Sequence, residues 1–244
     1  MELQGSTALV TGGGKRVGRA LVLALAQAGC NLILHYNRSA TDAEATAAEA
    51  RRLGAQVILK QADLLDPEGA RELVTAGEEG LPPAQILVNS AAIFPSDTLL
   101  DVTLDQWSRT FRVNLRAPVF LTQAFARRIR GRLPGAVINI TDWRTARPYP
   151  DHFSYSVAKG ALDAFTRAAA IALAPHIRVN AIALGAMLPP PDKDESYLQA
   201  LAASLPLKRA GGVEVIAETM LFLLRNDFIT GEIVRIDGGA HLQY

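Results

Sequence analysis

The chain has almost no cysteine and no excess of charge of either sign. Cys30 is the only cysteine among 244 residues, so a disulfide cannot form within the chain, and a reducing compartment fits this composition. Lysine and arginine together number 25, against 24 aspartates and glutamates, and they form no long basic block. We therefore expect no nucleic-acid partner.

Long hydrophobic runs are also lacking. No apolar run approaches the roughly 20 residues that a membrane-spanning helix needs. Residues 1–5 lack the charged and apolar regions of a signal peptide. Together these absences predict a cytoplasmic protein that has no membrane partner, and we expect no metal site.

What is present is an alternation of short β-rich runs with longer helical patterns. Hydrophobic residues make up 49% of the chain, which is ample for a large core, and no linker divides it, so we expect a single domain over residues 1–244. Strands that are apolar on both faces and alternate with helices predict an α/β fold, a doubly wound parallel sheet covered by helices on both faces. Strands are expected at 7–10, 31–36, 56–60, 85–89, 137–141, 177–182 and 232–236, and helices at 17–28, 41–53, 66–78, 104–129, around Tyr155 and at 213–225.

One stretch, residues 185–206, breaks this alternation. It contains Met187 and Leu188, a run of three prolines, and the acids Asp194 and Glu195. Because a long loop in a compact domain is usually functional or mobile, we interpret it as a substrate loop, with a plain surface loop as the alternative.

A glycine-rich turn, residues 11–18, lies between the first expected strand and the first expected helix. Glycines at such a position let the backbone approach a pyrophosphate at the helix N-terminus, so Gly12, Lys15, Arg16 and Val17 are predicted to bind a dinucleotide. A structural turn would explain one or two glycines but not this cluster in this place.

The end of the second expected strand distinguishes between the two nicotinamide cofactors. An NAD site commonly has an acid there, whereas this chain has His35, Tyr36, Asn37, Arg38 and Ser39. Arg38, Ser39 and His35, with the nearby basic pair of the glycine turn, are suited to a 2′-phosphate, which favours NADPH. The alternative is a solvated basic loop.

Two further strand ends are expected to face the same ligand. Asp63 and Leu64 follow the third strand, and Asn89, Ser90 and Ala91 follow the fourth. Asp63 is suited to accept a hydrogen bond from an adenine amino group, and the small residues leave room for the cofactor.

The candidate chemistry lies in Asp142, Tyr155 and Lys159. Tyr155 and Lys159 are four residues apart in a helical pattern, so they share one face, and a lysine beside a tyrosine is expected to lower the pKa of the phenol. A phenol adjusted in this way can exchange a proton with a reacting group. Asp142 follows the fifth strand and adds a second proton-exchanging group, unless it only caps the turn there.

These residues resemble the short-chain dehydrogenase/reductase family over nearly the whole chain, and Arg178-Val179-Asn180 and Asp237-Gly238-Gly239 also follow the order of that family. The resemblance implies a Rossmann-type fold, a nicotinamide cofactor and a homotetramer. It implies that Tyr155 is the proton donor, that Lys159 assists it and holds the nicotinamide ribose, and that Asn114 supports a water-linked proton path.

Three positions depart from the usual family pattern. Arg16 stands where the family has glycine, and Asp142 stands where it has a serine, 13 residues before the tyrosine (155 − 142 = 13). Leu184-Gly185 replaces Pro-Gly after the sixth strand, where Gly185 is expected to contact the cofactor. The first two departures resemble the pteridine reductase branch, and Phe94 matches its pterin-stacking phenylalanine, although Ala92 stands where some of these enzymes have a serine.

The resemblance implies NADPH-dependent reduction of a dihydropteridine, of dihydrobiopterin or dihydrofolate type, to the tetrahydro form. Phe94 and the nicotinamide would sandwich the flat ring, consistent with aromatic stacking. The predicted substrate contacts are Arg16, Phe94, Asp142, Tyr155, Met187 and Leu188. Two alternatives stay open: a reductase of 3-ketoacyl thioesters or other carbonyls, and an NADPH-binding regulatory protein without turnover.

Overall fold

A single parallel sheet organises the chain. The structure, a computed structural model, describes residues 1–77, 80–189 and 193–243. Its seven-stranded sheet has the order β3-β2-β1-β4-β5-β6-β7, and every neighbouring pair runs parallel. The strands are β1 Thr7–Thr11, β2 Asn31–Tyr36, β3 Val57–Gln61, β4 Ala84–Asn89, β5 Gly135–Asp142, β6 Ile177–Leu184 and β7 Ile233–Ile236.

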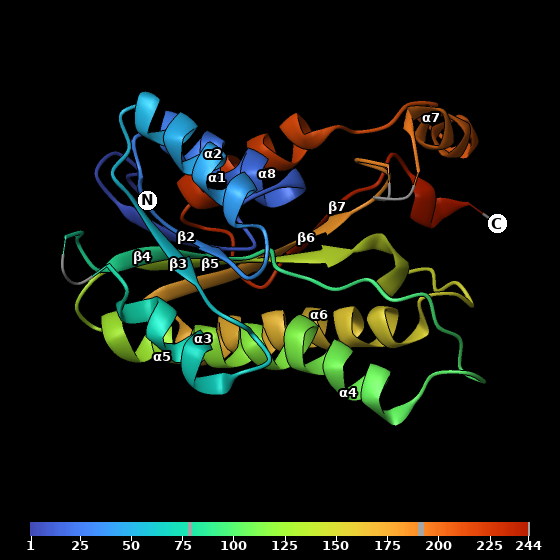
Figure 1. The fold of residues 1–244 in the computed structure, drawn as a ribbon, viewed down its shortest axis with the longest axis horizontal. Helices are drawn as coiled ribbons and strands as arrows, with labels where there is room; N and C mark the ends of the chain where they lie inside the picture. The colour runs from blue at the N-terminus through green and yellow to red at the C-terminus, as the bar shows by residue number, and fades with distance from the viewer. Residues whose placement is uncertain (78–79, 190–192, 244) are drawn as a thin grey trace.

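Helices cover both faces of this sheet (Figure 1). On one face lie α1 Arg16–Gln27, α2 Ala40–Arg52 and α8 Val213–Arg225, and on the other α3 Pro67–Thr75, α4 Leu104–Phe111, α5 Ala117–Ile129 and α6 Phe153–Leu173. The remaining α-helix of the described residues, α7 Glu195–Ser204, lies near the end of the sheet that carries β7 and the C-terminus. This is the doubly wound architecture that the sequence predicts.

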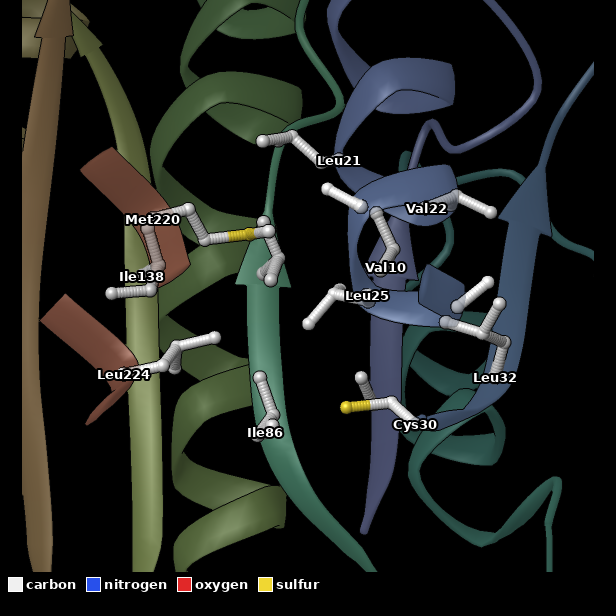
Figure 2. Packing of buried hydrophobic residues seen from close by; sticks show 14 of the residues in the cluster. Val10, Leu21, Val22, Leu25, Cys30, Leu32, Ile86, Ile138, Met220 and Leu224 are labelled. Carbon is white, nitrogen blue, oxygen red and sulfur yellow. The ribbon is translucent and has the colours of Figure 1, made fainter. Parts of the chain in front are cut away.

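The period-two alternation of the strands divides the core into two layers. Figure 2 shows Val10, Leu32, Ile86 and Ile138 on the face toward α1 and α8, which contribute Leu21, Val22, Leu25, Met220 and Leu224. Their chain neighbours Leu9, Ile33, Leu87 and Val137 belong to the opposite layer, around Phe125 of α5. Cys30 is fully buried in the first layer, and burial raises the pKa of its thiol to about 11, so it packs as a small apolar residue.

Most element boundaries agree with the sequence expectation to within one or two residues, and two differences bear on the site. The helix expected over 104–129 contains a turn of π-helix at Arg112–Arg116, between α4 and α5. The stretch 185–206 is not a continuous loop, because α7 begins after Asp194, whose carboxylate accepts a hydrogen bond from the amide of Tyr197.

Two expectations extend beyond the described residues. The helix expected over 66–78 ends at Thr75, and residue 78 is among those not described. Residues 190–192 of the expected substrate loop also lie outside the described part. Within the described ranges, no helix has the length and apolar character needed to cross a membrane.

The strand order reverses at β1, which sets the place of the site. From β1 the chain moves outward to β2 and β3, then returns to place β4 against the other side of β1, with Thr11 opposite Asn89. In such sheets ligands bind beyond the carboxyl ends of the strands at this reversal. The glycine turn and residues 89–91 both lie there.

Candidate functional site

The turn after β1 is held so tightly that it excludes side chains. Gly12 has φ +66°, and a Cβ there would lie 2.9 Å from the Cα of Ala91. A Cβ on Gly18, in the first turns of α1, would overlap the carbonyl oxygen of Gly12, and one on Gly14 would lie 3.1 Å from the amide nitrogen of Ala43. The glycines therefore allow strand, turn and helix to approach one another closely, as a backbone cradle for a pyrophosphate requires.

Thr11 joins the two sides of the reversal. Its hydroxyl accepts hydrogen bonds from the amides of Ser90 and Ala91, at 3.0 and 3.1 Å, and lies 3.4 Å from the carbonyl oxygen of Val88. The end of β4 is thus fixed against the glycine turn, with small residues at the contact.

His35 supports this turn from below and is not available to a phosphate. The side chain is 2% exposed, its Nδ1 accepts a hydrogen bond from the amide of Gly12 at 3.1 Å, and its Nε2 lies 3.1 Å from the carbonyl oxygen of Ala62. That arrangement requires a neutral ring protonated on Nε2, and burial lowers the pKa of His35 accordingly. The prediction that His35 binds a 2′-phosphate is wrong, because both nitrogens are occupied in the interior.

The other basic candidates are exposed. Lys15 and Arg38 are exposed, and Ser39 precedes α2 as its N-cap residue. Lys15 is the N-cap residue of α1 but makes no side-chain cap, so the first amides of that helix are not covered by their own N-cap. Tyr36, Asn37 and Val17 are partly buried around them.

Arg16 reaches across the site. Its φ of +53° lies in the left-handed region, which explains why glycine is usual at this position. Its guanidinium donates a hydrogen bond to the carbonyl oxygen of Pro189 at 2.6 Å. Arg16 therefore links the glycine turn to the stretch that follows β6.

The residues predicted to contact the cofactor at the ends of β3 and β4 differ in their exposure to solvent. Asp63 is exposed and accepts from the amide of Leu65, whereas Leu64 is buried. Asn89 is 2% exposed, and its amide donates to Asn139 Oδ1 at 2.8 Å, as part of a buried chain that continues to Thr166. Any contact of Asn89 with a cofactor is therefore left to its backbone.

Asp142 and Tyr155 meet at the carboxyl end of β5. The phenol of Tyr155 donates a hydrogen bond to Asp142 Oδ2 at 3.1 Å, while Asp142 Oδ1 accepts from the amide of Arg144 at 2.9 Å. Asp142 thus caps the turn with one oxygen and contacts the phenol with the other. The turn-capping role weighed from the sequence is present, and the role of Asp142 in proton exchange stays a prediction.

Lys159 is buried beneath this pair. Its side chain is 2% exposed, and Nζ donates to the carbonyl oxygen of Ile140 at 2.7 Å and lies 5.7 Å from the centre of the Tyr155 ring. Burial lowers the pKa of Lys159 to about 8, and the carboxylates of Asp142 and Asp163 oppose that fall. Lys159 is therefore expected to lose its proton at mildly alkaline pH.

The expected low pKa of Tyr155 is not found. Burial, followed by the Asp142 carboxylate, raises the pKa of Tyr155 well above its usual value. Burial also raises the pKa of Asp142, against the opposing effect of Arg144 and of the hydrogen bonds that it accepts. Within this pair it is the pKa of the carboxyl, and not that of the phenol, that shifts toward the neutral range, where a group can best exchange protons.

Asn114 lies in the π-helical turn and faces the chain beyond β4. Its amide is fully buried; Oδ1 accepts from the Ile93 amide at 2.9 Å, and Nδ2 donates to the Ile93 carbonyl at 2.8 Å. Because this pair occupies both ends of the amide, the side chain positions the backbone just before Phe94. A role for this side chain in a water-linked proton path stays a prediction.

Phe94 is not a core residue, because it is 45% exposed. One of its faces stacks on the ring of His152, with centroids 3.7 Å apart, and Tyr155 meets it edge-on at 4.6 Å. The guanidinium of Arg144 lies 5.4 Å from the ring centre. Because His152 covers one face of Phe94, a substrate ring could stack only on the other face.

His152 is a site residue that the sequence reasoning missed. It is the N-cap residue that precedes α6, with φ +51°, and its Nδ1 lies 2.6 Å from the carbonyl oxygen of Pro95. Nearby, Asp97 accepts hydrogen bonds from the amide and the hydroxyl of Ser154, which fastens the segment after Phe94 to the start of α6. No periodic pattern marks a residue in such a turn, so the sequence carries no signal that could have found it.

The residues after β6 have a packing role. A Cβ on Gly185 would overlap the backbone of Asp237, so this glycine is required for the close approach of the two strand ends. Met187 is buried and forms a wall of a cavity of about 380 Å³ with Leu205 and His241. Asp142, Tyr155 and Phe94 do not line that cavity, so contact of Met187 and the partly buried Leu188 with a substrate stays a prediction.

The chain is similar to known oxidoreductases in sequence and in fold. A family model described as enoyl-(acyl carrier protein) reductase matches residues 14–241. L-xylulose reductase of Bos taurus is 34% identical over 98% of both chains. The structure of FolM alternative dihydrofolate reductase 1 from Brucella canis, complexed with NADP, superposes with a TM-score of 0.95 at 36% identity, over 100% of this chain and 96% of that one.

A short-chain dehydrogenase from Burkholderia cenocepacia, in complex with NADP, gives a TM-score of 0.89 at 33% identity, over 98% of this chain and 99% of that one. The likenesses in sequence and in fold agree with each other. The chain is an oxidoreductase and belongs to the short-chain dehydrogenase/reductase family.

Proposed function

We propose that the protein is an NADPH-dependent reductase of dihydropteridines, of dihydrobiopterin or dihydrofolate type, in the manner of pteridine reductase. The observation that carries this proposal is the hydrogen bond between Asp142 and Tyr155, at 3.1 Å. A serine at position 142 would give the phenol a neutral hydroxyl partner, which suffices to polarise a ketone. A carboxyl can hold and deliver a proton, which suits reduction beside a ring nitrogen.

The residues at the β1–β4 reversal fit a dinucleotide with a 2′-phosphate. Gly12, Gly14 and Gly18 carry no side chain where strand, turn and helix approach one another at the N-terminus of α1, which favours a pyrophosphate. Lys15 and Arg38 are exposed cations, and residues 35–39 at the end of β2 include no acid. NADPH supplies a hydride, and the two neighbours that are complexed with NADP support this choice of cofactor.

The chain's own contribution is the proton. Tyr155 keeps its proton through the neutral range because burial and Asp142 raise its pKa, so it can donate a hydrogen bond toward a substrate nitrogen. The phenol has one proton, which it donates to Asp142 in this structure, so replenishment requires Asp142 in its acid form, donating to the phenol oxygen while the phenol donates to the substrate; burial, which raises the pKa of Asp142, favours that form. Lys159 provides positive charge below the phenol.

Phe94 and its neighbours suit a flat substrate. The exposed ring of Phe94, edge-on to Tyr155, offers an aromatic surface beside the proton-donating group. The likeness to an alternative dihydrofolate reductase supports a pteridine substrate. The likeness to L-xylulose reductase favours a second candidate, reduction of a carbonyl by the same cofactor and phenol.

Side-by-side assays separate the two candidates. We would measure NADPH oxidation with dihydrobiopterin, dihydrofolate, L-xylulose and a 3-ketoacyl thioester, for the native chain, Asp142→Ala and Asp142→Ser. The pteridine proposal expects native activity on a dihydropteridine and an approximately 10- to 100-fold lower turnover in Asp142→Ala with unchanged NADPH binding. Full dihydropteridine activity in Asp142→Ala would reduce Asp142 to a turn cap, and preference for a carbonyl that rises in Asp142→Ser would favour the second candidate.

Assembly and regulation without turnover stay predictions. Ile171 of α6 is 83% exposed and Phe222 of α8 is 56% exposed, which offers apolar surface for the predicted homotetramer. Light scattering in solution tests that state. Absence of NADPH oxidation across the whole substrate panel would instead favour a regulatory NADPH-binding protein.

A further inference from the structure

Three aromatic rings lie in a row at the start of α6. The ring of His152 stacks on that of Phe94, with centroids 3.7 Å apart and planes 14° apart, and Phe94 in turn meets Tyr155 edge-on at 4.6 Å. The row runs from the turn before α6, through the aromatic surface of the site, to the phenol. The proposed function uses Phe94 and Tyr155, and His152 is the third member of the row.

The side chain of His152 does not cap the helix that it precedes. An N-cap side chain commonly accepts a hydrogen bond from one of the first amides of its helix, and His152 makes no such bond. Asp97 serves those amides instead: its carbonyl oxygen accepts from the amide of Phe153 and its carboxylate from the amide of Ser154, both at 3.0 Å. The imidazole is therefore left to contact Phe94.

The backbone of His152 and one ring nitrogen fix the direction of its side chain. Its φ of +51° lies in the left-handed region, which costs free energy for any residue except glycine, although histidine is among the residues found there more often. Nδ1 lies 2.6 Å from the carbonyl oxygen of Pro95, and because a carbonyl oxygen only accepts, Nδ1 is the donor of this bond. The residue that follows Phe94 thus holds the imidazole flat against the phenylalanine.

Phe94 needs such support, because its side chain is 45% exposed. The hydrogen bonds of Asn114 fix only the backbone at Ile93. Around the ring of Phe94 lie His152, the edge-on ring of Tyr155 and the guanidinium of Arg144, which is 5.4 Å from its centre. Of these three, His152 is the one that lies parallel to the ring, so it sets the plane of the ring.

We propose that His152 is a positioning residue that stacks behind Phe94, holds its ring edge-on to Tyr155 and so presents its other face to a flat substrate beside the phenol. The role toward a substrate rests on the proposed function, whereas the stacking of the two rings does not. The competing explanation is structural: His152 only fastens the start of α6 to Pro95.

A double-mutant cycle on dihydropteridine reduction separates the two explanations. It compares the native chain, His152→Asn, Phe94→Leu and the double variant, because asparagine tolerates the left-handed backbone but has no aromatic ring. His152→Asn should raise the KM by about two- to tenfold and change kcat by less than about twofold, and the double variant should have the KM of Phe94→Leu alone. Effects on KM that multiply in the double variant would overturn the proposal.

Two further variants complete the cycle. His152→Tyr retains an aromatic ring without the imidazole donor to Pro95, so it should recover part of the lost KM. A tyrosine variant with the same KM as His152→Asn would favour the structural explanation. His176→Asn, at an exposed histidine just before β6, is the matched control and should equal the native chain.

NMR of the histidine rings tests the stack without any substrate. The chain has four histidines, so the signal of His152 is identified as the one that His152→Asn removes, or by elimination if that variant does not fold. Stacked on Phe94, its ring protons should resonate upfield of those of the exposed His176, and Phe94→Leu should abolish that difference. If dihydropteridines are not reduced, the proposed function fails while these signals still judge the position of His152. A His152 signal that is unchanged in Phe94→Leu would overturn the positioning role.

Discussion

The glycine turn after β1 and the pair Tyr155 and Lys159 on α6 lie in the same domain, but different interactions form them. The turn depends on backbone packed against backbone, where even a Cβ on Gly12 would lie 2.9 Å from Ala91. The pair on α6 depends on ionisable side chains whose pKa values are shifted by burial, and the pKa of Lys159 falls to about 8. The first region should tolerate no added atoms as long as His35 stays neutral, and the second should tolerate substitutions of similar shape but not changes of charge.

The largest effect is expected from removing the phenol oxygen of Tyr155. Tyr155→Phe keeps the ring that meets Phe94 but removes the donor to Asp142. Turnover is expected to fall by about 100- to 10,000-fold, with NADPH affinity changed little, because proton transfer by a placed side chain accounts for about this much of a rate. Stopped-flow NADPH oxidation measures the loss, and Tyr149→Phe, at an exposed tyrosine, is the control.

The matching test of the turn adds one carbon. In Gly18→Ala the new Cβ would meet the carbonyl oxygen of Gly12, which is backbone and cannot move cheaply. We expect the free energy of unfolding to fall by about 1–3 kcal/mol and NADPH binding to weaken at every pH. Chemical denaturation and calorimetry measure both effects.

Gly160→Ala provides the control for that experiment. This glycine lies within α6, and a Cβ there would meet nothing within 4 Å. Alanine should therefore stabilise the helix by about 0.5–1 kcal/mol. Equal destabilisation by both substitutions would contradict the close-packing explanation of the turn.

The pH dependence of the native chain gives a third test. Burial places the pKa of Lys159 at about 8, below its ordinary value, so the ammonium is present below that pH and is lost as the pH rises through it. Turnover should fall by about tenfold per pH unit above that point, as expected for one essential proton. A rate that stays level to pH 10 would show that charge on Lys159 is not required.

The smallest expected effect concerns the aromatic surface. Phe94→Leu retains apolar bulk but loses stacking, which contributes about 0.5–1.5 kcal/mol, so the KM for a dihydropteridine should rise by about two- to twelvefold. The kcat should change less, since Asp142 and Tyr155 are untouched. A large fall in kcat with unchanged KM would instead indicate that Phe94 positions Tyr155.

The fold was predictable because its determinants are local. Strands such as β2 and β4 are apolar on both faces, and glycines follow β1 at the reversal of strand order, so neighbouring residues carry the pattern. The helix α7 was missed although Asp194 is an ordinary N-cap, because three prolines just before it suggested a loop.

The site was predictable in composition but less so in geometry. His35 ends up beneath the glycine turn because a residue near the end of a strand can face either side of the sheet, and the sequence does not say which. The pKa of Tyr155 was predicted in the wrong direction, because burial outweighs a lysine whose Nζ lies 5.7 Å from the ring centre. Asp163 looked like any polar residue of a helix until its burial was known.

The π-helical turn at Arg112–Arg116 makes the length of one helix a determinant of the site. This turn holds Asn114 against Ile93, next to Phe94. Deleting one residue from it would restore a regular α-helix while keeping α4 and α5 in nearly the same orientation, because a π-helical turn takes up one extra residue in about one full turn. A single-codon deletion within these five residues would therefore leave the rest of the helix in place and remove the widened turn that carries Asn114, so its effect should be confined to the segment at Ile93 and Phe94.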